Sequence, residues 1–203
     1  MNKRYLFAFY KLFFAALVVF AIAHQANNLS HLGVFRPANY FSFFTIDANI
    51  LGAVAFLLSG ISYLMGKDNK TLQMLRGATT VYMVTTGIVY VILLSGLQES
   101  LNTNIPWVNF TLHYLFPVVI FLDWIVDRPR TAISSRRSLQ WLAFPAAWLA
   151  YSLVRGAIVG WYPYPFLDPS RESYGTIVVV CVVIAVFVIL LSLLIARIGR
   201  SKG

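Results

Sequence analysis

Six long apolar stretches dominate this sequence and limit the folds that are open to it. A helix needs roughly 20 mostly apolar residues to cross the hydrocarbon core of a bilayer, and each stretch approaches or exceeds that length. Their approximate positions are residues 6–23, 40–65, 77–97, 107–126, 139–160 and 174–198. The sequence therefore predicts an all-α polytopic membrane protein, in which residues 1–203 form a single bundle of six transmembrane helices.

The composition excludes a soluble domain. Hydrophobic residues make up 59% of the chain and charged residues 11%, whereas a soluble domain carries about 25% charged residues. Cys181 is the single cysteine, which excludes an intramolecular disulfide and any cysteine-based zinc or iron–sulfur site. Of the three histidines, His24 and His31 are expected in or beside a loop, so they do not provide paired haem ligands on facing helices. We therefore expect no metal and no cofactor.

The positive charges follow an alternating pattern along the chain. Twelve of the 16 Lys and Arg residues fall on one side of the six predicted spans. These are Lys3, Arg4, Lys67, Lys70, Arg76, Arg128, Arg130, Arg136, Arg137, Arg197, Arg200 and Lys202. The opposite loops hold Arg36 and Arg171. Because cytoplasmic loops are enriched in Lys and Arg, the pattern predicts a multi-pass protein of the bacterial cytoplasmic membrane with both termini in the cytoplasm.

The same pattern accounts for the net charge of +9 without a nucleic acid. Basic loops beside anionic headgroups make membrane lipids the expected partners. The sequence points to no particular protein partner. One alternative topology stays open, because Ala21-Ile22-Ala23 after the first apolar run could also be a signal-peptide cleavage site, leaving five spans.

Ionisable side chains inside the predicted spans are candidates for function, because each costs roughly 2.5–3.5 kcal/mol to insert into a membrane. Asp47, His113 and Arg155 fall in one layer about 8–10 Å below the outer surface, given 1.5 Å of rise per residue. Lys11 and Asp123 fall toward the cytoplasmic half and are expected to form a structural pair. A structural ion pair between Asp47 and Arg155 is the simpler alternative to a functional layer.

The second predicted span also contains uncharged polar residues near the depth of His113. Ser42, Thr45 and Asn49 are spaced so that they share one helix face, and Asp47 points about 200° away from Thr45. Helix-to-helix hydrogen bonding is the ordinary role of such residues in membranes. Their common depth with His113 nevertheless favours a shared site.

The fourth predicted span contains a second polar pair. Asn109 and His113 are four residues apart and therefore lie on one face. Pro117 follows one turn later and removes a backbone hydrogen bond. We expect the helix to be kinked or loosened beside the histidine.

The last outer loop, residues 161–169, contains three prolines and four aromatic residues. Aromatic residues at this position are typical of the membrane interface, but proline also stiffens the loop. It can therefore form a semi-rigid lid that recognises a lipid. The residues expected to form this lid are Tyr162, Pro163, Tyr164, Phe166 and Asp168.

Several motifs occur in the same order in a known family. They are Phe44-Thr45 with Asn49 four residues on, His113 with Pro117, Asp123-Trp124, Arg155-Gly156 and the YPYPFLDP loop at 162–169. In these motifs the chain resembles bacterial relatives of the androgen-induced, FAR-17a-type multi-span membrane proteins. The resemblance covers nearly the whole chain, and the proline-aromatic loop is its most distinctive element.

This resemblance implies an enzyme. Animal members of the family are similar in being threonine-type hydrolases of fatty acid esters of hydroxy fatty acids, in which one Thr and one His are essential. By position these roles fall on Thr45 as nucleophile and His113 as base. The expected substrate-binding or supporting residues are Asn49, Asn109, Arg155 and Asp47, of which Asp47 has no counterpart in the family pattern.

Two other function classes stay open from the sequence. A small-molecule or lipid transporter commonly has six spans with charged groups near the midplane, although no inverted repeat is visible here. A non-catalytic membrane scaffold would use the polar layer only for structure. In that case replacing Thr45 or His113 would affect stability alone.

Overall fold

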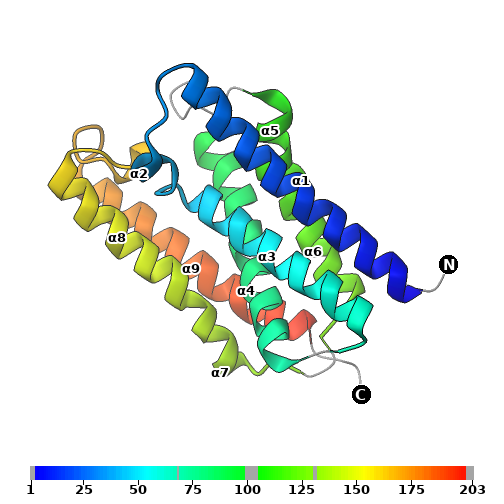
Figure 1. Cartoon of the computed structure of the whole chain (residues 1–203). Helices are drawn as coiled ribbons and strands as arrows, with labels where there is room; N and C mark the ends of the chain where they lie inside the picture. The colour runs from blue at the N-terminus through cyan, green and yellow to red at the C-terminus, as the bar shows by residue number, and fades with distance from the viewer. Residues whose placement is uncertain (1–2, 68, 99–104, 130–131, 200–203) are drawn as a thin grey trace.

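A computed structural model describes residues 3–67, 69–98, 105–129 and 132–199 (Figure 1). Every regular element in these ranges is helical. Six helices are long and apolar enough to cross a membrane: Lys3–His31, Phe44–Met65, Lys70–Leu94, Pro106–Val126, Ser135–Val159 and Tyr174–Ile198. The all-α class and the predicted number of helices long and apolar enough to span a membrane are thus confirmed. The predicted loop cations Arg130, Arg200 and Lys202 lie outside the described residues.

Several spans combine more than one helical segment. In chain order the elements are α1 (Lys3–His31), α2 (Pro37–Tyr40), α3 (Phe44–Met65), α4 (Lys70–Val89), η1 (Tyr90–Leu94), α5 (Pro106–Phe110), η2 (Thr111–Leu115), α6 (Phe116–Val126), α7 (Ser135–Ser138), η3 (Leu139–Leu142), α8 (Ala143–Val159), η4 (Pro165–Leu167) and α9 (Tyr174–Ile198). Both η1 and η2 are π-helical turns, so the third and fourth spans each contain a wide turn at residues 90–94 and 111–115.

Capping groups mark several of the helix ends. Asn69 accepts a hydrogen bond from the Leu72 amide at 2.7 Å and begins α4. Ser173 does the same for Thr176 at the start of α9, at 3.1 Å. Gly66 ends α3 with a φ of 68°, a left-handed conformation that glycine adopts without strain. These caps fix where the spans start and stop.

The helices form one bundle with a crowded centre. Helix α1 packs along α3, α3 packs against α4, and α4 contacts both α6 and α9. The central side chains are large and almost fully buried: Phe56, Met83, Phe116, Ile120 and Trp124. The start of α1 and the end of α9 lie at the same end of the bundle, called the base below (Figure 1).

Helix α8 is the least buried of the six long helices. Only Ser152 and Gly156 are buried along its length from Ala143 to Val159. Gly156 is packed directly against the Tyr162 ring, where a larger side chain would overlap. Helix α8 also packs on the bundle through Phe144 in its first turn, whose ring centroid lies 5.0 Å from that of Tyr82 and 5.5 Å from that of Phe44.

Three local expectations are wrong. Helix α1 extends to residue 31, so His24 lies within a helix and not in or beside a loop, whereas His31 ends the helix beside the loop that follows. Helix α3 begins at Phe44, so Ser42 precedes it and does not share a helix face with Thr45; its hydroxyl donates to the Ala38 carbonyl at 2.6 Å. Arg76 is not a loop residue but is buried within α4. It forms ion pairs with the carboxylates of Asp123 in α6 and of Asp127, which directly follows α6.

Candidate functional site

A cavity of about 600 Å³ lies at the end of the bundle opposite the base. Its walls come from the end of α1, the segment around α2, the start of α3, η1, α5 with η2, and the loop 160–171. Thr45, Asn109 and His113 all line it. Three of the predicted site residues therefore share one cavity wall, whereas Asp47, Asn49 and Arg155 are not part of it.

Thr45 is positioned by the first turn of α3 and is 8% exposed. The hydroxyl oxygen of Tyr164 accepts a hydrogen bond from the Thr45 amide at 3.2 Å and lies 3.3 Å from Thr45 Oγ1. Burial raises the pKa of Tyr164 to about 12, the charge of Asp47 adds to the rise, and the hydrogen bonds with Thr45 oppose it. Tyr164 is therefore a neutral phenol at physiological pH, with a proton to donate at the threonine hydroxyl.

His113 is 4% exposed and lies in the π-helical turn η2. Its Nδ1 is 3.1 Å from the Asn109 carbonyl oxygen. A carbonyl can only accept, so Nδ1 carries the proton and Nε2 of the neutral ring is left as an acceptor. The Tyr90 ring stacks on the imidazole with 3.9 Å between the ring centroids. These contacts hold the ring in the tautomer that a general base requires.

The wide turn at His113 confirms that the helix is loosened before Pro117. Pro117 has no N–H to offer to the His113 carbonyl one turn earlier, and π-helical turns are frequent at functional sites. Gly87 of α4 lies against this turn, since a Cβ there would be 3.3 Å from the His113 carbonyl oxygen. The turns η1 and η2 thus supply Tyr90 and His113 as a stacked pair.

The two asparagines of the predicted site form hydrogen bonds with groups that position Thr45 and His113. Asn49 donates from Nδ2 to the Thr45 carbonyl at 2.8 Å and to the Leu112 carbonyl at 3.2 Å, which joins α3 to η2. Asn109 donates to the Tyr90 hydroxyl at 2.7 Å. Within the described chain the Oδ1 atoms of both asparagines are buried without a hydrogen-bond partner. Such unpaired acceptors are uncommon in folded proteins.

The predicted pair of Asp47 and Arg155 is not formed among the described residues. Arg155 instead donates to Asn39 Oδ1 at 2.6 Å, and its guanidinium lies 5.1 Å from the centre of the Trp161 ring. Asn39 lines the cavity but Arg155 and Asp47 do not. Arg155 therefore reaches the cavity only through Asn39.

The cations that do line the cavity are Arg36 and Arg171. The sequence interpretation used them only to orient the spans and did not include them in the site. Tyr90 was also missed, because an aromatic residue near the end of an apolar span carries no signal that distinguishes it from core. The position of Arg36 and Arg171 in two of the predicted outer loops was the available signal.

The proline-aromatic loop divides its side chains between two cavities. Tyr162, Pro163 and Asp168 line the polar cavity. Tyr164 and Phe166, which stack with 5.3 Å between centroids, line a second cavity of about 310 Å³ whose wall is almost entirely apolar. The Asp168 carboxylate accepts hydrogen bonds from the hydroxyl and the amide of Ser170, which lower its pKa.

Thr45 lines both cavities, whereas His113 lines only the polar one. No hydrogen bond joins Thr45 to His113 in the part of the chain that the structure describes. Catalytic hydrogen bonds are often long or absent before substrate binds. The Thr45 hydroxyl thus lies where the two cavities meet, with the His113 imidazole in the wall of the polar cavity and the Tyr164 phenol in the wall of the apolar one.

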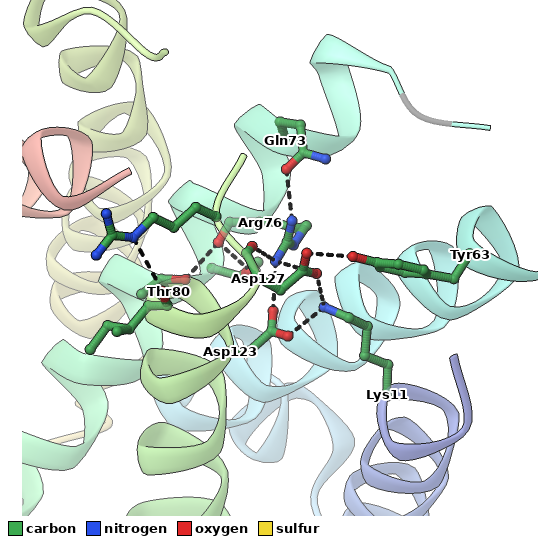
Figure 2. Close-up of polar contacts among 10 residues, drawn as sticks. Lys11, Tyr63, Gln73, Arg76, Thr80, Asp123 and Asp127 are labelled. Atoms are coloured by element: carbon green, nitrogen blue, oxygen red, sulfur yellow. Dashed lines mark hydrogen bonds and ion pairs between the residues drawn. The ribbon is translucent and has the colours of Figure 1, made fainter. Parts of the chain in front are cut away.

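A second polar cluster lies near the base of the bundle, where Lys11 and Asp123 pair as predicted (Figure 2). Lys11 Nζ is 2.5 Å from Asp123 and 2.8 Å from Asp127. Arg76 Nη2 is 2.9 Å from an oxygen of each carboxylate. The Tyr63 hydroxyl donates to Asp127. The cluster has two cations and two anions and connects α1, α3, α4 and the end of α6.

The charges in this cluster set the pKa of Asp127, which follows α6. Burial alone would raise its pKa, but the charges of Arg76 and Lys11 and the hydrogen bonds from Lys11 and Tyr63 bring it below the usual value. Asp127 therefore stays ionised. We interpret the cluster as a structural lock that joins four helices.

No group of three or more His, Cys, Asp or Glu side chains that could hold a metal ion occurs in the described ranges. No family model, no curated protein and no solved structure matches the chain.

Proposed function

We propose that this chain is an integral membrane hydrolase of lipid esters, with Thr45 as the nucleophile and His113 as the general base. The observation that carries the proposal is that both side chains line one cavity while Thr45 also borders an apolar one. The resemblance to threonine-type hydrolases of fatty acid esters of hydroxy fatty acids supports the same two residues. Such esters are the substrates we expect.

A threonine hydroxyl needs a neighbouring base, because it is a weak nucleophile when protonated. In the proposed reaction Thr45 Oγ1 attacks the ester carbonyl and His113 Nε2 takes its proton. The ester C–O bond then breaks, and His113 returns the proton to the leaving alcohol. Water then gives a proton to the same nitrogen and attacks the carbonyl of the acyl-threonine. The bond to Thr45 Oγ1 breaks, the acid leaves, and Nε2 returns that proton to Oγ1. The Nδ1 hydrogen bond to the Asn109 carbonyl supports Nε2 as the atom that moves the proton.

Tyr164 is our preferred donor to the developing oxyanion. Its hydroxyl is a neutral donor next to Thr45 Oγ1, and donors aimed at developing charge give large rate effects. Asn49 suits this role less well, since its amide already donates to two backbone carbonyls. We assign Asn49 and Asn109 to positioning.

Arg36 and Arg171 suit a substrate that carries a free carboxylate, because both line the polar cavity and guanidinium binds carboxylate in a bidentate manner. Arg155 takes a supporting role by holding Asn39. We further propose that this cavity faces the outer side of the bacterial cytoplasmic membrane. The excess of cations on the loops at the other side supports that orientation.

A transporter is less favoured by the same geometry. The polar cavity and the charge cluster of Lys11, Arg76, Asp123 and Asp127 lie toward opposite ends of the bundle. Large apolar side chains such as Phe56 and Phe116, each at most 1% exposed, fill the core of the bundle. A continuous polar path would have to pass them.

Covalent labelling tests the nucleophile without knowledge of the natural substrate. A long-chain alkyl fluorophosphonate loses fluoride when an activated hydroxyl attacks its phosphorus. We expect one adduct, located by mass spectrometry on the peptide that contains Thr45. We expect no adduct in Thr45→Val, and labelling at least 100-fold slower in His113→Ala, the low end of what a general base contributes.

Thr111→Val is the matched control, since Thr111 is equally buried but its hydroxyl donates to a carbonyl of its own helix. This variant should label like the wild type. An adduct that persists in Thr45→Val, or the absence of any adduct on the wild type, would contradict the proposal.

A further inference from the structure

The apolar cavity beside Thr45 has its own walls. It is lined by Thr86 and Val89 of α4, Ala146 and Leu149 of α8, and Cys181 and Ala185 of α9. At the end next to the loop it is bounded by Phe44, Thr45, Tyr164 and Phe166.

The cavity reaches the surface of the bundle. Ala146 and Ala185 line it and are both exposed, so it is accessible between α8 and α9. That surface would lie in lipid if these helices cross a membrane. An apolar chain can therefore enter from the side, which suits an occupant drawn from the lipid phase.

We propose that this cavity binds the acyl chain of the scissile ester, while the alcohol half occupies the polar cavity; this rests on the proposed function. The polar and the apolar cavity meet at Thr45. An ester carbonyl bound there carries an acyl chain and an alcohol half, and each cavity can hold one of them. The leaving oxygen must receive its proton from His113, and His113 lines only the polar cavity. The alcohol half is thereby assigned to the polar cavity and the acyl half to the apolar one.

The later steps of the reaction agree with this assignment. The acyl group remains bonded to Thr45 after the alcohol leaves, so it needs a site that holds it without blocking water. The polar cavity, with Arg36 and Arg171 in its wall, is the side from which water reaches the acyl-threonine. An acyl chain held in the apolar cavity leaves that side clear.

The positions of the lining residues along α9 predict which of them limits the length of the bound acyl chain. Thr45 lies at the loop end, so Cys181 is near the carbonyl and Ala185 is one turn farther toward the base. A phenylalanine at position 185 should fill the distal part of the cavity. The variant protein would then hydrolyse esters of short acyl groups in preference to those of long ones.

The test compares esters that share one alcohol and differ in acyl length from four to sixteen carbons. We expect Ala185→Phe to lower kcat/KM for the longest ester by about 10- to 200-fold, the range that hydrophobic pockets give for size discrimination. The four-carbon ester should lose far less kcat/KM than the longest ester. The elution and thermal unfolding of the variant are compared with those of the wild type to show that it folds. Ala146→Phe is a second variant with the same expected result.

Val183→Phe is the matched control, because Val183 is exposed on α9 and does not line the cavity. It should leave the length profile unchanged. A length profile that Ala185→Phe does not alter, or that Val183→Phe alters in the same way, would overturn the assignment.

A binding measurement separates this inference from the hydrolase proposal. Thr45→Ala protein is irradiated with a fatty acid that carries a diazirine in mid-chain, and the crosslinked peptides are identified. We expect crosslinks on α8 and α9 that Ala185→Phe removes and Val183→Phe retains. Crosslinks elsewhere would refute the chain site, whereas an inert wild type with crosslinks on α8 and α9 would refute only the catalytic role of Thr45.

Discussion

Replacing His113 by alanine is expected to lower kcat for ester hydrolysis by two to four orders of magnitude, the contribution that general bases typically make. The imidazole is held by the Asn109 carbonyl and by stacking on Tyr90, so that Nε2 is free to accept a proton. Without it the Thr45 hydroxyl loses the imidazole in the cavity wall that we propose as its base. The rate is measured at saturating ester with purified protein in detergent.

His31→Ala is the control for this variant, because His31 lies exposed at the end of α1, away from the cavity wall. It should retain the wild-type rate. Because His113 is buried, each variant is first compared with the wild type by its elution and thermal unfolding. A folded His113→Ala protein that keeps the wild-type kcat would remove His113 from the mechanism.

Replacing Asp123 by alanine is expected to lower the free energy of unfolding by about 3–5 kcal/mol, the usual cost of removing one partner of a buried ion pair. Lys11 and Arg76 would then share Asp127 as their carboxylate within the cluster. Lys11 is fully buried, so water cannot replace the lost partner. Unfolding in a mixed-micelle titration measures the effect.

A double variant distinguishes charge from packing in this cluster. Lys11→Met with Asp123→Leu removes one cation and one anion together, and such paired replacements are often neutral. We expect it to recover most of the stability that Asp123→Ala loses. If the double variant is less stable than Asp123→Ala, the cluster does not act through charge balance.

The helical architecture was largely predictable because membrane insertion imposes a length and an apolar composition on each span. The depth of Thr45 and His113 followed from the same constraint, since the position of a residue along a span fixes its level. Their place in one cavity wall agrees with that estimate. The structural pair of Lys11 and Asp123 was predictable for the same reason.

Side-chain partners within a layer were not predictable, because they depend on how the helices turn about their axes. Arg155 matched Asp47 in depth but contacts Asn39. Asp127 was not expected to join Lys11, since it lies beyond the end of the fourth span. The contact between Tyr164 and Thr45 depends on how the loop folds back over α3, which a sequence of aromatics and prolines does not specify.

The measurement that tests the central claim most directly is hydrolysis of a panel of lipid esters, including fatty acid esters of hydroxy fatty acids, by wild type, Thr45→Val and Thr45→Ser. Valine keeps the shape of threonine without its hydroxyl, and serine keeps a hydroxyl. We predict that the wild type hydrolyses at least one ester, that Thr45→Ser retains part of this activity and that Thr45→Val has none. An inert wild type, or a Thr45→Val protein that hydrolyses at the wild-type rate, would contradict the assignment of Thr45 as a nucleophile.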